Sequence, residues 1–395
     1  MGKKINFSLE QQMPTAQDYA APVFTSNGAA GSYIPYSGEH SKHPNLFPEE
    51  IKFYAKNCVW NGRLINFKAK QIAGKGFIQL EEDEATKEML ANINDKEEDA
   101  NEVLEKVGKD DALYGGFALL IVWSTDWKRW LSVEHVDFSK IRIGAVNEDG
   151  LITKYYYSFD WSKGMRMQEI PAFNWGKAKT NAKQFEKDPT TLNLEERTQL
   201  LYCQPYGFGE YYYPLPDYIA ALSAIRGDIN GDLYAEVALG NGISETTWIN
   251  LVGTYTDEQF VEEAQTIIDN YAGAKNAGAP MITKSKTKEE TPQISKAGTD
   301  SKESKFTAVS TSVMQKIVSA HSLTSPLLAG IALPGALGNR DEMIDAYELF
   351  YSNWTQREQM FVAKVFNKLL KINGMSPVKI DRLTIFDEQL NKPQS

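Results

Sequence analysis

The sequence predicts an α+β fold, and three features of its apolar pattern support this prediction. Apolar residues recur with a helical period over residues 48–113, and they alternate with a period of two over residues 117–204. Beyond Pro216 the helical period returns in longer segments. With 395 residues, 42% hydrophobic and 24% charged, the chain has the composition of a folded globular protein and enough length for more than one domain.

Residues 1–44 are predicted to form an extended arm, because they are rich in Ala, Gly, Ser, Pro and Gln and lack periodic apolar positions. Two interpretations of this arm remain open, a segment that grips a partner through its aromatic residues and a frayed terminus. Over residues 48–72 the pattern predicts two helices joined near Asn61 and Gly62. A third helix is expected over residues 95–113, with an apolar side formed by Val103, Leu104 and Val107.

Short strands are predicted next, separated by turn residues such as those of 147–150. They span Phe117–Trp123, Trp130–Val136, Ile141–Val146, Ile152–Phe159, Met165–Ile170 and Leu200–Gln204. The first half of the chain is therefore expected to be one α+β domain.

The second half is predicted to be mainly helical. Over residues 216–240 one apolar stripe indicates a long helix; it consists of Ile219, Leu222, Ile225, Ile229, Leu233 and Val237. Thr256 and Gln259 have the spacing of a capping box that opens a helix ending near Gly273. Strands are expected at residues 280–283 and 291–295, on either side of a charged turn at 284–290. A further helix is predicted over residues 302–319.

The loop at residues 322–339 is the most unusual segment of the sequence. It is long, apolar and punctuated by Gly and Pro, which indicates that it is either buried in an assembly or used for function. Asn339 with Glu342 is expected to cap a final helix over residues 340–373. The apolar stripe of that helix is predicted to consist of Met343, Tyr347, Phe350, Trp354, Phe361, Val365 and Leu369.

The charge balance limits the partners that this protein can bind. With 42 Lys plus Arg against 52 Asp plus Glu, the formal net charge is -10, which argues against a protein that wraps DNA tightly. A lysine-rich stretch that includes Lys284, Lys286, Lys288 and Lys296 is interleaved with acidic residues. Two interpretations of this stretch remain open, weak and reversible contact with phosphates and a hairpin that is solvated or paired with a neighbouring subunit.

Catalytic motifs are not found in the sequence, and we expect no enzyme activity and no cofactor. The only two cysteines, Cys58 and Cys203, are predicted to be buried thiols of a reducing compartment. His40 and His43 are three residues apart, which is compatible with a surface metal or with two solvated side chains; His135 and His321 are expected to be structural. No nucleotide-binding glycine motif, targeting segment or membrane-spanning run is predicted.

Four ordered segments together resemble the short portal proteins of tailed bacteriophages. These segments are Asn45–Pro48 followed by Lys68–Phe77, Tyr212–Pro216 with the long helix up to Gly240–Gly242, Asn270–Gly278, and Ile317 and His321 followed by Ser325–Ile331. The resemblance covers most of residues 45–373.

The resemblance implies a portal-type fold assembled as a ring. Its parts would be an arm (1–44), an α+β wing (45–213), a stem helix (214–241), a small α/β clip (242–300), a second stem helix (301–321), a tunnel loop (322–339), a long tunnel or wing helix (340–373) and a short tail or minimal crown (374–395). It also implies a ring of about twelve identical subunits, with closed symmetry that buries helices a monomer leaves exposed.

The same resemblance implies a structural function, and not an enzymatic one. Viral double-stranded DNA would be packaged and ejected through the channel of a ring at one capsid vertex of the virion, assembled in the host cytoplasm and away from membranes. The implied partners are the terminase large subunit, a head-tail adaptor and the major capsid protein. The clip lysines Lys284, Lys286, Lys288 and Lys296 would lie on the surface that meets motor and adaptor.

Five residues of the tunnel loop and its helix are expected to approach the channel axis: Leu333, Pro334, Leu337, Asn339 and Arg340. The alternative is that they pack against the neighbouring subunit. Two other functions remain open for the whole chain. One is another head-tail connector, baseplate or capsid structural protein, and the other is a nucleic-acid-processing enzyme.

Overall fold

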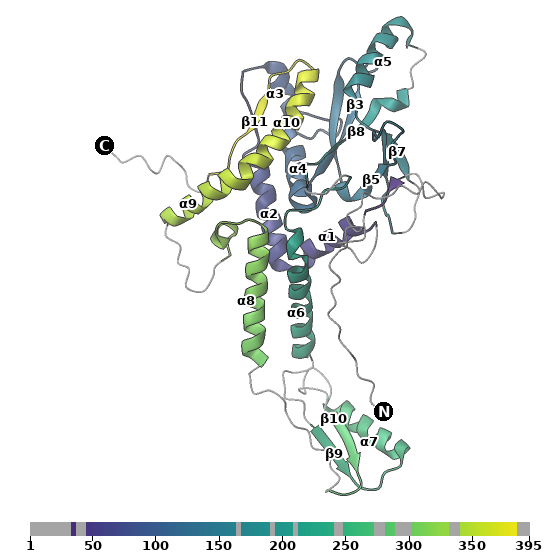
Figure 1. Ribbon diagram of the computed structural model, residues 1–395, viewed down its shortest axis with the longest axis vertical. Helices are drawn as coiled ribbons and strands as arrows, with labels where there is room; N and C mark the ends of the chain where they lie inside the picture. Colours follow the sequence, from purple (N-terminus) through teal and green to yellow (C-terminus); the bar gives the residue numbers. More distant parts are fainter. Residues whose placement is uncertain are drawn as a thin grey trace, which may run out of the picture. The chain divides into compact units, whose positions relative to one another are not determined.

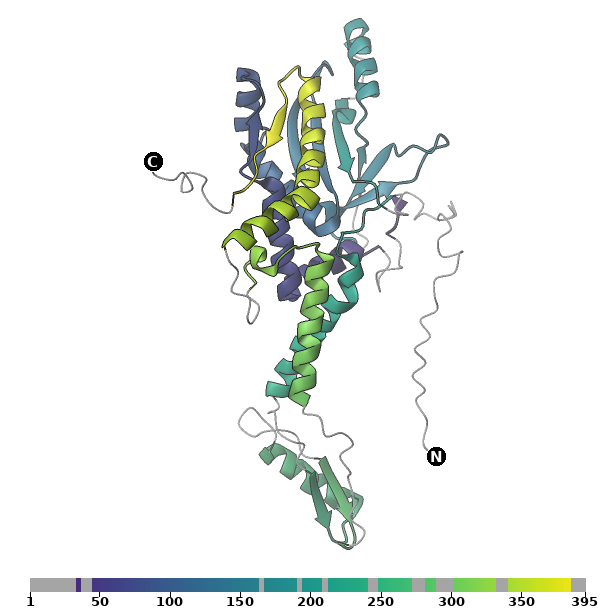
Figure 2. The same cartoon turned by 60° about the vertical axis from the view of Figure 1, so that its left-hand side comes forward.

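The structure is a computed structural model, and two units emerge from its internal contacts. It describes residues 33–36, 45–162, 167–189, 194–207, 212–240, 248–271, 281–288, 302–331 and 340–384. The first unit is formed by residues 1–53, 65–217 and 335–395, and the second by residues 54–64 and 218–334. Figures 1 and 2 show the elements of both units in two views.

The two helices predicted at the start of the domain are α1 (Phe47–Asn57) and α2 (Val59–Ala73). The break between them lies at Cys58, so the predicted junction at Asn61 and Gly62 is wrong. A Cβ atom on Gly62 would lie 2.3 Å from the backbone oxygen of Ala55. The glycine therefore serves close packing of α2 on the end of α1, and it does not end a helix.

The next helices are α3 (Glu84–Ala91) and α4 (Ala100–Tyr114). Asp99 and Glu102 form a capping box at the start of α4, which explains why the helix begins later than the predicted residue 95. The predicted apolar side is confirmed, because Val103, Leu104 and Val107 are fully buried. Helix α5 (Trp175–Lys187) was not predicted, although Trp175, Ala178, Ala182 and Phe185 recur at helical spacing in its lysine-rich sequence.

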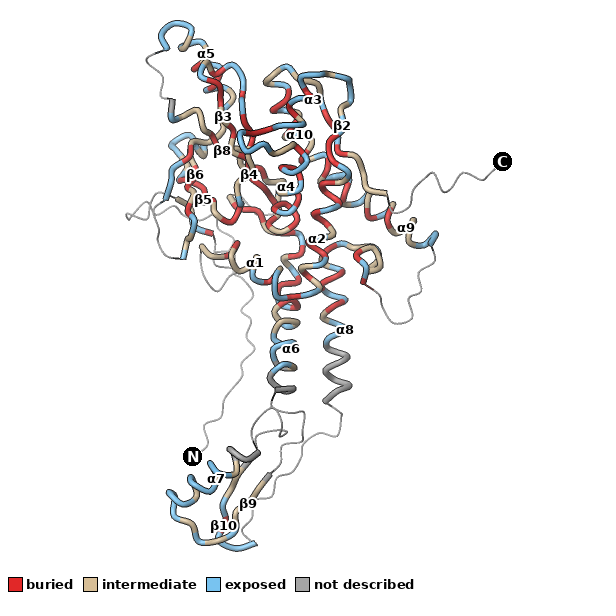
Figure 3. Tube along the Cα trace, turned by 180° about the vertical axis from the view of Figure 1, so that it is seen from behind, coloured by how far each residue is buried: buried red, intermediate tan, exposed pale blue. Residues whose placement is uncertain are grey.

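The described residues of the first unit form three small sheets. The central sheet has the antiparallel order β4-β3-β8, with β3 (Phe117–Trp123), β4 (Trp130–Val136) and β8 (Thr198–Cys203). A second has the order β1-β5-β6-β7, with β1 (Tyr33–Ile34), β5 (Ile141–Gly144), β6 (Lys154–Tyr157) and β7 (Gln168–Pro171). The predicted strands are thus confirmed, with shifted ends. Buried residues gather on α4, β3 and β8 (Figure 3).

The third sheet pairs a strand from the N-terminal half of the chain with a strand close to its C-terminus. Strand β2 (Phe77–Gln79) pairs in antiparallel register with β11 (Val378–Ile380), which was not predicted. The described part of the predicted C-terminal tail therefore contributes a strand. Likewise β1, in the predicted arm, pairs with β5, so that residues 33–34 of the arm belong to a sheet.

The C-terminal helix consists of α9 (Arg340–Phe350), a π-helical turn (Tyr351–Thr355) and α10 (Gln356–Ile372). Tyr347 and Phe350 are buried as predicted. From the turn onward, the predicted stripe is confirmed at Leu369 but is wrong at Trp354, Phe361 and Val365, which are only partly buried. The extra residue of a π turn rotates the helix face, so the buried positions become Thr355, Gln359, Val362, Phe366 and Leu369.

The second unit contains a pair of long helices that lie side by side, α6 (Leu222–Gly240) and α8 (Lys302–Ala320) (Figures 1 and 2). A 3₁₀ turn at Ile219–Ala221 precedes α6, and α8 agrees with the prediction within one residue. Ile225 and Ile317 are fully buried, but Leu233 in the same α6 stripe is 56% exposed. Part of the apolar stripe of α6 is thus left uncovered by the residues that the structure describes.

The second unit also contains a βαβ element made of β9 (Trp248–Val252), α7 (Asp257–Tyr271) and β10 (Met281–Ser285). The two strands are parallel and in register, which requires a crossover such as α7. Strand β9 was not predicted, and Lys284 lies in β10 and not in the predicted turn. The strand expected at residues 291–295 lies outside the described residues.

Alanine at Gly74 is expected to destabilise the first unit by about 3 kcal/mol, the sum of a left-handed backbone cost and an overlap cost. Gly74 has φ +58°, and a Cβ atom there would lie 2.0 Å from the backbone oxygen of Asp381. Gly150 is a matched control, because its φ is +75° but nothing lies within 4 Å of a Cβ. G150A should cost only about 1 kcal/mol in denaturant unfolding. Equal losses for both variants would refute the close approach at Gly74.

Candidate functional site

The βαβ element of the second unit, together with the residues that follow β10, contains most of the lysines predicted to form a docking surface. At the start of α7, the Thr256 hydroxyl accepts a hydrogen bond from the Gln259 backbone at 3.2 Å, and the Gln259 side chain accepts one from the Thr256 backbone at 3.2 Å. This reciprocal pair confirms the predicted capping box. It also fixes the direction of the acidic first turn of α7, which contains Asp257 and Glu258.

Lys284 is tied to α7 and does not stand free in solution. Its ammonium donates a hydrogen bond to Asp257 at 2.5 Å and lies 5.2 Å from the centre of the Phe260 ring. The hydrogen bond from Lys284 lowers the pKa of Asp257 below its usual value. Lys286 and Lys288 follow β10 and are exposed, whereas Lys296 lies outside the described residues. Lys284, Lys286 and Lys288 thus come together at the end of one strand.

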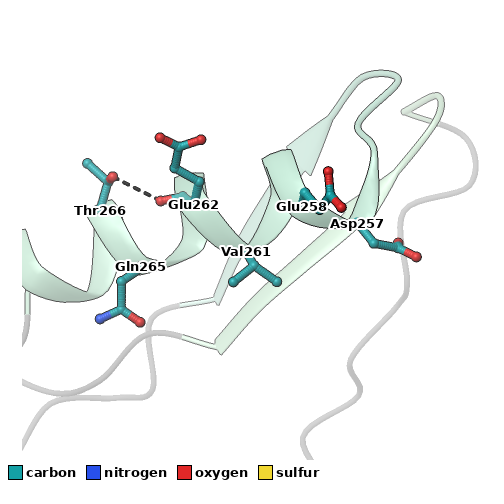
Figure 4. Close-up of a pocket in the computed structure, with 6 residues that line it drawn as sticks. All are labelled: Asp257, Glu258, Val261, Glu262, Gln265 and Thr266. Atoms are coloured by element: carbon teal, nitrogen blue, oxygen red, sulfur yellow. Dashed lines mark hydrogen bonds between the residues drawn. The ribbon is translucent and has the colours of Figure 1, made fainter.

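A shallow depression of about 660 Å³ lies along one side of α7 (Figure 4). Its lining consists of Asp257, Glu258, Val261, Glu262, Gln265 and Thr266. Val261 is 64% exposed, so an apolar side chain stands among three carboxylates. Such a surface repels nucleic acid, but it suits a basic protein surface with an apolar centre.

The predicted tunnel residues divide between the described and the undescribed parts of the chain. Leu333, Pro334, Leu337 and Asn339 lie outside the described residues, and Arg340 is the exposed first residue of α9. The described beginning of this loop contains a 3₁₀ turn, Pro326–Ala329, which ends at Gly330 in the left-handed conformation with φ +70°.

One arginine of α2 holds the start of that loop. The Arg63 guanidinium donates a hydrogen bond from Nε to the Ala329 backbone oxygen at 2.5 Å. A Cβ atom on Gly330 would lie 2.3 Å from the same guanidinium, so glycine is required there. Arg63 was not among the predicted site residues, because nothing local in its helix position signals a contact 266 residues away.

His321 lies at the end of α8 within the second unit. It is fully buried, its Nε2 lies 2.9 Å from Asn61 Oδ1, and its ring stacks on Tyr218 with centroids 4.6 Å apart. Cys58 is also buried in this unit, and its thiol donates a hydrogen bond to Asp228 at 3.2 Å. Burial raises the pKa of Cys58 to about 12, so the thiol is not nucleophilic.

A buried charge cluster in the first unit was not predicted at all. Lys68 on α2 is fully buried and forms an ion pair with Asp217, while its ammonium lies 4.5 Å from the centre of the Trp354 ring. The Trp354 indole donates a hydrogen bond to the same Asp217 oxygen at 3.1 Å. Trp354 belongs to the π-helical turn. The cluster therefore connects α2, through Lys68, with this turn and with Asp217.

Two further carboxylates stand close to Lys68. Burial raises the pKa of Asp111 well above its usual value and also raises that of Glu358. Burial lowers the pKa of Lys68, and Asp217 opposes this change. The cluster therefore holds one buried cation that depends mainly on Asp217.

Arg142 forms a second buried anchor in the first unit. Its side chain is fully buried and donates to Asn45 Oδ1 at 2.7 Å and to the backbone oxygens of Ser139 and Ile141 at 2.9 and 2.8 Å. The guanidinium also lies over Tyr36 and Trp161, at 4.9 and 4.6 Å from the ring centres. Arg142 belongs to β5, and its contacts therefore hold both Tyr36 and Asn45 against that strand.

The described residues contain no arrangement that suggests catalysis. No group of three or more His, Cys, Asp or Glu among them is placed to hold a metal ion, and His40 and His43 lie outside them. His135 Nε2 lies 2.7 Å from Asp110, which also accepts a hydrogen bond from the Phe138 backbone at 3.0 Å. Cys203 is buried and free. No helix in this part of the chain is both long and apolar enough to span a bilayer.

Comparison with known proteins shows what this architecture is similar to. No protein-family model and no curated protein sequence matches the chain. Solved structures do match it. A chain from the neck of an empty gene transfer agent (GTA) particle computed with C6 symmetry has a TM-score of 0.55 and 15% identity, with 92% of this chain and 89% of that chain covered.

Two further GTA structures give the same result. A chain from the virion of a native GTA particle has a TM-score of 0.53 and 15% identity, covering 91% of this chain and 88% of that one. A chain from the neck of the native particle computed with C12 symmetry has a TM-score of 0.52 and 14% identity, covering 90% and 87%. The chain therefore has, over nearly its whole length, the mixed α/β fold of a chain found in GTA particles.

Proposed function

We propose that this chain is a structural subunit of a head-tail connector in a phage-like particle, and that it is a connector of the portal type. The observation that carries this proposal is the likeness in fold, over about nine-tenths of both chains, to subunits of GTA particle necks. Those necks were computed with C6 and C12 symmetry, which supports a ring of identical subunits and favours twelve copies.

In this proposal, the parts of the ring follow the division expected from the sequence. Residues 45–213 form the wing, α6 and α8 the stem, residues 242–300 the clip, residues 322–339 the tunnel loop and residues 340–373 the helix that follows it. The exposed Leu233 supports the stem assignment, because a neighbouring subunit would cover the open part of the α6 stripe.

The partners follow from that arrangement. Viral double-stranded DNA would pass through the channel, driven by a terminase large subunit, and the ring would contact the major capsid protein and later a head-tail adaptor. The acidic side of α7 and the exposed Lys286 and Lys288 are the surfaces of the clip that we assign to motor and adaptor. Leu333, Pro334, Leu337, Asn339 and Arg340 would lie nearest the channel axis.

The proposal is tested by the mass and image of the purified full-length protein. Native mass spectrometry should show about twelve copies, and cryo-electron microscopy without imposed symmetry should show a central channel with residues 332–340 at its narrowest point. A protein that stays monomeric at all concentrations would contradict the ring. A ring that carries those residues on its outside would contradict their place at the axis.

A pair of matched variants makes the ring test specific to the stem. L233E places a charge in the open stripe of α6 and is expected to abolish the ring while the chain stays folded. L151E makes the same change at a leucine of the first unit that is 61% exposed, and it should leave the ring intact. Rings of normal size with L233E would remove α6 from the subunit interface.

A further inference from the structure

The outward side of α10 has a charge opposite to that of the chain as a whole. Four cationic residues, Arg357, Lys364, Lys368 and Lys371, are exposed on this helix. We call them the basic face. They belong to a chain whose formal net charge is -10. The acidic residues of the long C-terminal helix lie mainly on α9, before the π-helical turn: Asp341, Glu342, Asp345 and Glu348.

Packing of the opposite side of α10 fixes the direction of the basic face. The Phe366 and Phe77 rings lie 4.8 Å apart, and the Trp130 indole donates a hydrogen bond to the Leu369 backbone oxygen at 2.7 Å. On the turn before them, the Gln359 side chain donates to the Gln71 backbone oxygen at 2.8 Å. Contacts with three separate elements prevent the helix from rotating, so the cations are held outward. Figures 1 and 2 show α10 in yellow at the front of the first unit.

The basic face has no ion pair in the described part of the chain; burial raises the pKa of Glu358, and the nearby Arg357 opposes this change. Its four cations form none of the ion pairs found among the described residues. The single carboxylate of α10, Glu358, is partly buried on the side of Lys68. Strand β11, which packs beside α10, adds the exposed Lys379, and Asp381 follows that strand. The like charges Lys364 and Lys368 also repel each other at i,i+4.

We propose that the basic face of α10 binds the phosphate backbone of double-stranded DNA without reading its sequence. This inference rests on the proposed function, which brings DNA to the protein. From Arg357 to Lys371 the face extends about 21 Å at 1.5 Å per residue, which matches about six phosphates of one strand at 3.4 Å each. Lysines on flexible stems position a duplex by charge and do not specify bases.

A protein partner fits this face less well than DNA does. The centre of a protein interface is depleted in lysine and rich in aromatic and apolar side chains. The only large apolar side chain exposed along the basic face is Met360, at 65%. The other occupants to distinguish by experiment are an acidic protein segment and the acidic surface of a second copy.

The test is the salt dependence of binding to a short duplex DNA, measured by fluorescence anisotropy with the full chain. Neutralising three phosphate contacts in K364Q/K368Q/K371Q should reduce the slope of log K against log salt by about 2.7 for each subunit bound. Between 50 and 200 mM salt this corresponds to about a 40-fold change in affinity. Duplexes of different sequence should bind equally well, and K364R/K368R/K371R should bind as the natural chain does.

Helix α5 supplies the matched control. Lys179, Lys183 and Lys187 are exposed on one helix, like the three lysines replaced on α10. K179Q/K183Q/K187Q removes the same charge and should leave the slope unchanged. Equal effects of the two triple variants would show that net charge sets the affinity, and this would overturn the proposal.

Three other outcomes would also overturn the proposal. One is an unchanged slope with the α10 variant, and a second is loss of the ring with that variant, which would assign the face to a subunit interface. The third is binding of poly-glutamate but not DNA, which would assign it to an acidic protein segment. The experiments can refute the inference and the proposed function independently of each other. A ring with unchanged DNA binding refutes only the inference, and a monomer whose DNA binding depends on α10 refutes only the ring.

Discussion

Replacing Asp217 by alanine is expected to lower the free energy of unfolding by about 3 kcal/mol. The reason is that Lys68 is fully buried and Asp217 is its ion-pair partner, so the variant leaves a buried cation without compensation. The Trp354 indole also loses its acceptor in this variant. Because the Asp217 side chain is 38% exposed, water can enter, which keeps the loss at the lower end of the range for broken buried pairs.

A double variant separates the unpaired charge from lost packing. In K68M/D217A both charges are removed, and most of the stability is expected to return, because well-packed apolar side chains often replace a buried pair without cost. The matched surface control is E84A, whose partner Lys87 is 71% exposed, and its loss should stay below about 1 kcal/mol. Equilibrium denaturation measures all three. A loss for D217A as small as that for E84A would show that Lys68 does not depend on Asp217.

Replacing Arg142 by alanine is expected to cost about 3 to 5 kcal/mol, the largest loss among the variants considered. The guanidinium is fully buried, and the backbone oxygens of Ser139 and Ile141 would lose their donor. Glu49, whose carboxylate lies 3.5 Å from the guanidinium, would remain without its cation. Because Arg142 also bonds Asn45 and lies over Tyr36, the amide protection of residues 33–36 and 45 should fall.

Denaturant unfolding measures the loss of stability, and hydrogen exchange measures the loss of amide protection. R142K keeps the charge but not the planar fork, so it should recover only a small part of the loss. The control is R382A: Arg382 pairs with Glu348 at 2.9 Å, both side chains are partly exposed, and its loss should not exceed about 1 kcal/mol. If R142A lost stability but residues 33–36 kept their protection, the segment would be held by other contacts, and Tyr213 would be the first to examine.

The helices and strands of the first unit could be predicted mainly from local patterns. Strands β3 and β4 follow the alternation of apolar residues, and the buried side of α4 follows the helical period. Helix α5 and strand β9 were missed although each has an apolar pattern, at helical spacing in α5 and as the short run Trp248–Val252 in β9. The shift of the buried stripe in α10 was missed because a π turn adds one residue without any local signal in the sequence.

The candidate sites were much harder to predict than the elements. The clip lysines were recognised as a group, but the pairing of Lys284 with Asp257 depends on how β10 lies against α7. The basic face of α10 depends on which side of the helix is buried, and the predicted stripe was wrong at Trp354, Phe361 and Val365. Arg63 and Lys68 look like ordinary exposed helix positions, although each contacts a residue more than a hundred positions away.

The sequence by itself determined where most helices and strands form, the capping box of Thr256 and Gln259, and the burial of Cys58 and Cys203. These properties follow from short-range periodicity and composition, because the spacing of apolar residues indicates which side chains of a segment face the core and which face solvent. Only the tertiary structure decided which charges are buried together, as at Lys68 and Arg142, and which cations of α10 stay in solution. A buried charge is stable only beside its partner, and that partner is brought to it by the packing of elements far apart in the chain.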